Sequence, residues 1–436
     1  MLITMYNYVI TILTKRRSTM KKILFALLTA VLAVTMMFAL TSCGEPELEF
    51  VLSDDGSYYI LDACALKKQN MEIEIPAEYE GKPVKEIADD AFYTYNGDSS
   101  LAKLTVPASV TIIHNNIGDV CRSDYLEGHK LSIYYGGSEQ LWLSSFDSYL
   151  GYDLYINDTL VTSPTIPSDM TEIPDGYASS CASITEINIP DHVTAIGRSA
   201  FNGCTNVKTL TISKNVDSIG EYAFANLVNL TAFNYTAKNA TVGDVSDSGR
   251  MDSDGAFYDL GVDSTGVVLT IGKSVEYIPA HFLNADANYS YEGINIKEFI
   301  IDDDCDLKGI GNQAFAKTVS SLDGLNEYEG VYYFGSESNP YMFLMGTTDL
   351  TMTSLTIHED CKYILDLAFR DCDDLESVTI PEGVEYIGRY AFYRTTLTFE
   401  NTSGWKMNDG TTKSANLSKV SDSDSDEYYY GITRMQ

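Results

Sequence analysis

A repeat of 23 residues in the middle of the chain constrains the fold more strongly than any other feature of the sequence. When residues 184–227 are shifted by 23 positions, every large apolar side chain falls on another. The superposed pairs are Ile187 and Leu210, Ile189 and Ile212, Val193 and Val216, Ile196 and Ile219, Gly197 and Gly220, Ala200 and Ala223, and Phe201 and Phe224. Such a period is typical of stacked repeats, in which no unit can bury its own apolar face. The sequence therefore predicts a solenoid.

The pattern inside one unit predicts a coil that begins with a short strand. Apolar residues alternate with polar ones at Ile187 and Ile189, and Pro190 ends the strand because proline cannot donate a hydrogen bond to a ladder. Gly197 suits a tight corner. The pair Ala200 and Phe201 predicts about one helical or 3₁₀ turn, with the phenylalanine ring filling the interior of the coil.

The pattern I-x-I-P-x-x-V-x-x-I-G-x-x-A-F-x-x-C, which runs from Ile187 to Cys204, resembles the leucine-rich repeats of BspA-type bacterial surface proteins. The resemblance covers most of the chain after the N-terminal segment. It implies a leucine-rich-repeat solenoid, which is a right-handed, β-rich α/β stack of short parallel strands with short helical or 3₁₀ turns. It also implies a surface-exposed, adhesion-type protein, since some members of this family bind host matrix proteins.

Interruptions of the period predict how the chain is divided. Alternation on both sides of Asp55 and Gly56 predicts a hairpin, which we expect to cap the N-terminal end of the array. Stretches that begin at Tyr134, Tyr152 and Val331 resemble the β-type inserts between repeat blocks of these proteins. The expected segments are 1–42, a lipoprotein signal peptide; 43–49, a tether; 50–122, the cap and first repeats; 123–160, an insert; 161–400, the main array with inserts; and 401–436, a C-terminal tail or cap.

The N-terminal segment predicts export. Two lysines, Lys21 and Lys22, precede an apolar run over residues 23–40, and Met20 would be a sufficient start for this signal. Residues 40–43, Leu-Thr-Ser-Cys, resemble the lipobox of bacterial lipoproteins, which implies cleavage before Cys43 and acylation of that residue. The alternative is a single transmembrane anchor, because an apolar run of 18 residues is just long enough to span a bilayer. The lipoprotein interpretation, which we favour, places the chain outside the cytoplasm, lipid-anchored to the bacterial cell membrane or outer surface.

The net negative charge of the chain limits the classes of partner that it can bind. Without residues 1–42 the chain has 24 basic and 62 acidic side chains, a formal net charge of −38. Such a surface repels nucleic acid and anionic headgroups, so we expect no nucleic-acid partner and membrane contact only through the lipid anchor.

Cysteine and aspartate positions favour structural roles over metal or disulfide chemistry. Four cysteines follow the Ala position of a unit by four residues, where a small buried side chain is expected, and Cys361 replaces an inward valine. Cys181 and Cys204 occupy equivalent positions in adjacent coils, so a bridge between them stays open. The acidic turns lack EF-hand spacing and are interpreted as solvated, with no metal or cofactor expected. The four cysteines that follow the Ala position are Cys121, Cys181, Cys204 and Cys372. One acidic turn contains Asp302, Asp303, Asp304 and Asp306, and the other contains Asp252 and Asp254.

The sequence contains no catalytic signature. G-x-S-x-G, H-E-x-x-H and P-loop motifs are absent, and the histidines fall mostly at turns or on the surface of coils. The histidines are His114, His129, His192, His281 and His358, and clustered tyrosines occur at Tyr58 and Tyr59, Tyr134 and Tyr135, Tyr332 and Tyr333, and Tyr428 to Tyr430. Most of these tyrosines are expected in the core, although exposed ones suit protein interfaces or sugar stacking.

The function predicted from the sequence is therefore adhesion or protein binding without catalysis, along the face formed by the stacked strands. The ligand would be a host extracellular-matrix protein or a protein of the bacterial envelope. The alternatives are a carbohydrate-binding surface protein, marked by aligned exposed aromatic residues, and a hydrolase with an unrecognised carboxylate pair in one cleft.

Overall fold

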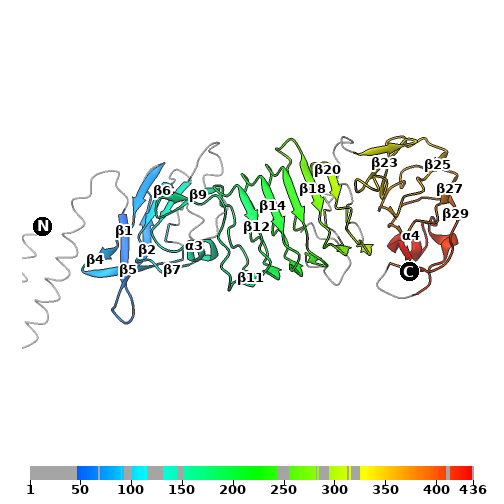
Figure 1. Cartoon of the computed structure of the whole chain (residues 1–436). Helices are drawn as coiled ribbons and strands as arrows, with labels where there is room; N and C mark the ends of the chain where they lie inside the picture. The colour runs from blue at the N-terminus through cyan, green and yellow to red at the C-terminus, as the bar shows by residue number, and fades with distance from the viewer. Residues whose placement is uncertain are drawn as a thin grey trace, which may run out of the picture. The chain divides into compact units, whose positions relative to one another are not determined.

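The computed structural model describes residues 47–66, 69–89, 91–92, 101–114, 131–145, 151–243, 255–280, 282–283, 294–311, 314–315, 325–408 and 413–434. The chain divides into two units, Met1–Glu47 and Leu48–Gln436, and nearly all described residues belong to the second (Figure 1). The predicted signal peptide, Cys43 and Cys121 lie outside the described residues. None of the helices in the described ranges has both the length and the apolar character that crossing a membrane requires.

The described chain begins with the predicted hairpin. Strand β1 starts at Glu47, inside the segment expected as a tether, and its turn closes where the Gly56 nitrogen donates to the Ser53 carbonyl oxygen at 2.8 Å. Parallel pairing of β2 with β5 joins the hairpin to the first coil, with Leu61 opposite Ile87. This sheet has the order β1-β2-β5-β4, with β7 also paired to β5. Its strands are β1 (Glu47–Leu52), β2 (Tyr59–Ala65), β4 (Glu78–Tyr79), β5 (Lys82–Ile87) and β7 (Ile112–Ile113).

A second sheet, of order β10-β9-β8-β6-β3, continues through the segment predicted as an insert. Both β8 and β9 lie in that segment and pair in parallel, with Ile133 opposite Leu154, so the ladder does not break where the sequence period lapses. A helix, α3, follows β8 and buries Trp142 and Leu143. These elements are β3 (Met71–Glu74), β6 (Leu101–Val106), β8 (Leu131–Tyr135), α3 (Glu139–Ser145), β9 (Tyr152–Ile156) and β10 (Thr159–Leu160).

The central array has two parallel ladders, one of longer strands and one of two-residue strands (Figure 1). The 23-residue superposition is confirmed as direct pairing, because Ile187 lies opposite Leu210 and Ile196 opposite Ile219. The long ladder contains β12 (Glu186–Asn188), β14 (Thr209–Ile212), β16 (Ala232–Tyr235), β18 (Val267–Ile271) and β20 (Ile296–Ile301). The short strands are β11 (Glu172–Ile173), β13 (Ala195–Ile196), β15 (Ser218–Ile219) and β17 (Thr241–Val242), followed by the pair β19 (Tyr277–Ile278) and β21 (Gly309–Ile310).

Stacked phenylalanine rings fill the interior of these coils. The Phe201 and Phe224 rings are 5.5 Å apart, Phe224 and Phe257 are 5.6 Å apart, and both pairs are within 7° of parallel. The helical or 3₁₀ turn expected at this corner is a hydrogen-bonded turn in which Ser199 and Tyr222 have φ of 54°. A positive φ interrupts the right-handed helical conformation, so the turn stays short.

The last block repeats the design and is closed by the C-terminal segment. The stretch from Val331 forms part of an antiparallel arrangement of β22, β23 and β24, after which parallel coils resume. Strand β31 then pairs antiparallel with β28 and caps the last coil. One sheet contains β22 (Asn326–Tyr328), β23 (Val331–Phe334), β24 (Phe343–Thr347), β26 (Tyr363–Ile364), β28 (Tyr386–Ile387), β31 (Ile432–Arg434) and β30 (Trp405–Met407), and the other contains β25 (Ser354–Thr356), β27 (Ser377–Ile380) and β29 (Thr396–Phe399). Two short helices, η2 (Leu417–Lys419) and α4 (Asp426–Tyr430), lie in the cap.

Candidate binding surface

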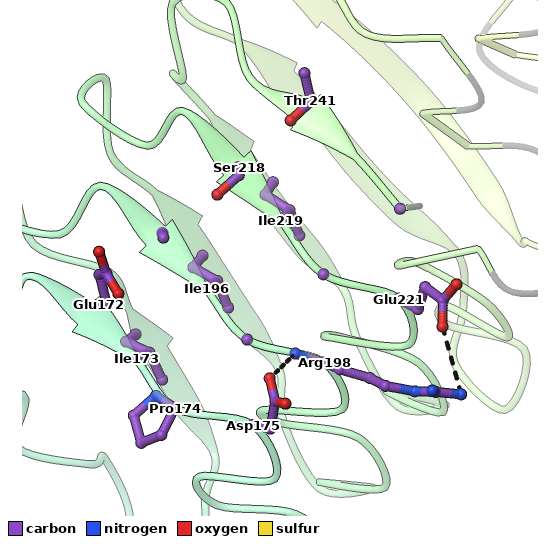
Figure 2. Close-up of a pocket in the computed structure, with 14 residues that line it drawn as sticks. Glu172, Ile173, Pro174, Asp175, Ile196, Arg198, Ser218, Ile219, Glu221 and Thr241 are labelled. Atoms are coloured by element: carbon purple, nitrogen blue, oxygen red, sulfur yellow. Dashed lines mark hydrogen bonds and ion pairs between the residues drawn. The ribbon is translucent and has the colours of Figure 1, made fainter. Parts of the chain in front are cut away.

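A hollow of about 630 Å³ lies over the outward face of the short ladder (Figure 2). The buried side chains of Ile173, Ile196 and Ile219 point into the coils, because residues of a strand alternate between its two faces. The outward position of each strand carries a different side chain, namely Glu172, Ala195, Ser218 and Thr241 in successive coils. The floor of this first hollow therefore consists of small side chains and main chain, except at the Glu172 end.

A glycine follows the buried isoleucine in the central strands and adds no side chain to the floor of the first hollow. A Cβ atom on Gly197 would lie 2.5 Å from the Asp175 nitrogen, and one on Gly220 would lie 2.6 Å from the Arg198 nitrogen. These distances are too short for any side chain, so the glycines allow successive coils to approach each other closely. They also leave main chain exposed along the first hollow.

Charged side chains form one wall of the first hollow. An Asp175 carboxylate oxygen accepts a hydrogen bond from the main-chain nitrogen of Arg198 at 2.7 Å, and the Arg198 guanidinium is 3.4 Å from a carboxylate oxygen of Glu221 (Figure 2). The Arg198 side chain is 60% exposed, so this ion pair orients the side chains and contributes little stability.

A second hollow, of about 740 Å³, adjoins the first and shares Thr241 and Gly243 with it. It continues over β19 and β21 and reaches the residues directly before β26 and β28 and the end of β31. Its charged lining residues are Asp306, Lys308, Lys362, Glu385 and Arg434. We call the two hollows together the trough.

A carboxylate with two lysine partners stands beside the second hollow. The Glu276 oxygens are 3.0 Å from the Lys238 ammonium and 2.9 Å from the Lys308 ammonium. Hydrogen bonds from Lys308 and then Lys238 hold the pKa of Glu276 below its ordinary value, and the bond to Glu276 raises the pKa of Lys308.

The described cysteines are free thiols, and most are buried. Cys181 and Cys204 are fully buried and not bridged to each other; the Cys204 thiol donates to the Ala178 carbonyl oxygen at 3.2 Å. Burial raises the pKa of the Cys181 thiol to about 11 and also raises that of Cys204, so both stay protonated at neutral pH. Cys361 and Cys372 are buried as well.

The predicted acidic turn uses its carboxylates to fix loops. Asp302 accepts a hydrogen bond from the Asp304 nitrogen at 3.0 Å, and Asp303 accepts one from the Ser338 nitrogen at 2.8 Å. Within the described ranges, no three His, Cys, Asp or Glu side chains converge as metal ligands would. Asp252 and Asp254 lie outside those ranges.

The described histidines lie far apart in the sequence, and each contacts a different residue. His114 is 3.0 Å from a Glu86 oxygen, and His192 is 2.9 Å from the Pro167 carbonyl oxygen. The His358 ring stacks on Tyr341, with centroids 3.9 Å apart. His129 and His281 lie outside the described residues.

The clustered tyrosines divide between core and surface. Tyr135, Tyr333 and Tyr428 are buried, whereas the Tyr58 and Tyr59 hydroxyls bind Glu86 and Glu80 at the cap. The Tyr134 and Tyr155 rings stack face to face at 4.3 Å, and the Lys103 ammonium lies 4.6 Å from the Tyr134 centroid. Both faces of the Tyr134 ring are thus occupied, which is unlike a platform of coplanar rings for sugar stacking.

Two parallel ladders wound into coils of about 23 residues define a leucine-rich-repeat protein. The family model for the BspA type leucine rich repeat region matches residues 148–246 and 287–404 with six copies. The chain belongs to this BspA-type family, and the fold predicted from the sequence is confirmed.

Several solved structures resemble the chain. A leucine rich cell surface protein from Faecalibacterium prausnitzii is 21% identical, with 84% of this chain and 95% of that chain covered and a TM-score of 0.35. A leucine-rich repeat protein from Bacteroides ovatus is 14% identical, with 84% and 100% covered and a TM-score of 0.38. The pneumococcal vaccine antigen PcpA is 16% identical, with 83% and 71% covered and a TM-score of 0.25. A search of curated proteins finds no match.

The trough was not predicted from the sequence, which pointed only to a face of stacked strands. A signal was nevertheless present: the glycine after each inward isoleucine, at Gly197 and Gly220, predicts exposed main chain between coils. The charged residues that line the second hollow carried no signal, because they come from separate blocks of the chain.

Proposed function

We propose that this chain is an exported lipoprotein of the bacterial surface and is anchored through Cys43. In this proposal the trough binds a protein ligand, and the chain catalyses no reaction. The N-terminal sequence around Lys21, Lys22 and Cys43 supports export and acylation. Membership of the BspA-type family supports a role in protein binding.

One observation carries the binding proposal, namely that the trough runs across successive coils. Hollows of about 630 and 740 Å³ adjoin one another, so the surface is long enough for a protein segment and is not confined to a small molecule. Its floor exposes main-chain groups, and its walls carry charges of both signs. Such a surface can bind the main chain and the polar side chains of another protein.

The test of binding uses purified residues 44–436 without lipid on arrays of host matrix proteins, bacterial envelope proteins and glycans at several salt concentrations. Ser218→Tyr fills the floor of the first hollow, while Thr209→Tyr adds the same ring to the outward face of the long ladder. We expect saturable binding to a protein that Ser218→Tyr abolishes and Thr209→Tyr keeps. Equal binding by both variants would contradict the assignment of the binding surface to the trough.

The test of anchoring compares the full chain with Cys43→Ala in a bacterial host supplied with labelled palmitate. We expect label and membrane association in the parent chain and neither in the variant. A variant that stays membrane-bound would favour the transmembrane-anchor alternative.

A second candidate function, glycan binding, is favoured by one other surface. The outward positions of β25, β27 and β29 all carry hydroxyl groups, and none of these groups hydrogen-bonds to another described residue. The six exposed residues are Ser354, Thr356, Ser377, Thr379, Thr396 and Thr398. The triple variant Thr356→Val, Thr379→Val and Thr398→Val removes hydroxyls at nearly constant shape. Loss of retention on neutral polysaccharide in this variant would support the candidate, and unchanged retention would discard it.

The absence of catalysis is also part of the proposal. A carboxylate pair in a hydrolase needs one carboxyl group with a raised pKa to act as the acid. The described carboxyl groups with shifted pKa values all shift downward, because hydrogen bonds stabilise their charged forms. They are Asp55, Glu276, Asp303, Asp349 and Asp422.

A further inference from the structure

Charge is distributed unevenly along the trough. The first hollow is lined by three carboxylates, Glu172, Asp175 and Glu221, and by one cation, Arg198, which Glu221 already pairs. The second hollow is lined by three cations and two carboxylates. Glu276, beside the second hollow, already pairs with Lys308, so the lining cations that no described carboxylate pairs are Lys362 and Arg434.

One exposed charge near each end of the trough has no ion-pair partner among the described residues. These are Glu172 on β11 and Lys362 directly before β26. Near Lys362, one guanidinium nitrogen of Arg434 donates to the Glu382 carbonyl oxygen at 2.6 Å, which leaves other donors of that group for a ligand. The two ends therefore offer opposite charges to whatever lies in the trough.

The distance between the two ends sets the length of a ligand that contacts both. The lining residues lie on or beside β11, β13, β15, β17, β19, β21 and β31, and directly before β26 and β28. At about 4.8 Å per strand, the trough is on the order of 40 Å long. An extended peptide of about 12 residues spans this distance.

We propose that the trough binds an extended peptide segment with segregated charges, cationic over Glu172 and anionic over Lys362 and Arg434. This inference rests on the proposed protein binding and adds the chemistry of the partner. A polyanion such as nucleic acid or a sulfated glycan is repelled at the Glu172 end, and a neutral glycan gains nothing from the charges. A peptide can carry both signs and can hydrogen-bond to the main chain of the floor.

The test uses two fluorescent 14-residue peptides of the same composition and residues 44–436 of the chain. In one peptide four lysines are separated from four glutamates by the six-residue spacer Gly-Ser-Thr-Gly-Ser-Thr; in the other the charges alternate. We expect the segregated peptide to bind several-fold more tightly, with an advantage that shrinks as salt rises. A photo-crosslinker beside the lysine block should label residues around Glu172, and one beside the glutamate block should label residues around Lys362. Equal affinities, or labels outside the trough, would overturn the proposal.

Charge reversal provides a sharper test. Glu172→Lys and Lys362→Glu should each weaken binding of the segregated peptide about two- to tenfold, since each replaces an exposed attraction by a repulsion. The double variant should bind it again with the two crosslinking positions exchanged, because the peptide reverses direction. Glu298→Lys, on the outward face of β20, is the matched control and should leave affinity unchanged.

The two proposals fail in different ways. If array proteins bind and Ser218→Tyr abolishes that binding, but segregated peptides have no advantage, the charge inference falls and protein binding stands. If neither proteins nor peptides bind to the trough, both fall.

Discussion

The carboxylate of Asp175 accepts a hydrogen bond from the main-chain nitrogen of Arg198 at 2.7 Å, and the two residues are 23 positions apart. The same relationship recurs in the last block, where Asp366 accepts from the main-chain nitrogen of Arg389. In both coils a glycine stands just before the arginine, and a Cβ atom on it would meet the aspartate. A shift of one 23-residue period thus places an aspartate acceptor in one coil beside a main-chain nitrogen donor in the next. The glycine before the donor leaves room for the aspartate.

Removing this acceptor should weaken the array locally. Asp175→Ala leaves the Arg198 nitrogen to water, and we expect a loss of about 1 kcal/mol in the free energy of unfolding, measured by urea titration. Asp169→Ala, an exposed residue in the preceding turn, is the control and should change stability by less than about 0.5 kcal/mol. A similar loss in both variants would contradict the role given to Asp175.

The close approach of coils should make Gly220 intolerant of any side chain. Gly220→Ala places a Cβ atom 2.6 Å from the main-chain nitrogen of Arg198, so the coils must separate. We expect a loss of about 1–3 kcal/mol in the free energy of unfolding. In Gly309→Ala the nearest atoms are 3.3 Å away in the half-exposed Tyr277 ring, which can move, and the loss should be clearly smaller. Equal losses would show that backbone contact is not the cause.

The Glu276 carboxylate should contribute to stability only above acidic pH. Its pKa is lower in the folded chain than the ordinary 4.5, because Lys308 and Lys238 donate hydrogen bonds to it. Such a group stabilises the fold above its unfolded pKa, and the contribution is lost as the pH falls through the folded pKa. The thermal midpoint of the parent chain should therefore exceed that of Glu276→Gln at pH 7, and the gap should close as the pH falls below about 4.5. A gap independent of pH would contradict this assignment.

Burial should protect the thiols of Cys181 and Cys204. Both are fully buried with raised pKa values, so iodoacetamide at pH 8 should leave them unmodified in the native chain. Both should react after unfolding in urea without a reductant. Detection of a linked peptide pair by mass spectrometry would instead establish a bridge between them.

Strand register could be predicted from the sequence wherever the period holds. Ile187, Leu210, Ile196 and Ile219 were placed as neighbours by a 23-residue shift, and they pair in that way. The reason is that identical units stack most favourably when equivalent apolar residues share one interior. The same logic predicted that Cys181 and Cys204 occupy small buried positions.

Tertiary structure alone decided the features that do not depend on repetition. Strands β8 and β9 extend a parallel ladder where the period lapses, because main-chain hydrogen bonds do not require similar side chains. The pairing of β31 with β28, which closes the last coil, is likewise not encoded in any periodic pattern. The cationic lining of the second hollow arises because Lys308, Lys362 and Arg434 come together from three parts of the chain. The repeated apolar positions determined the solenoid from the sequence; the path of the chain through its irregular segments determined which charges line the trough.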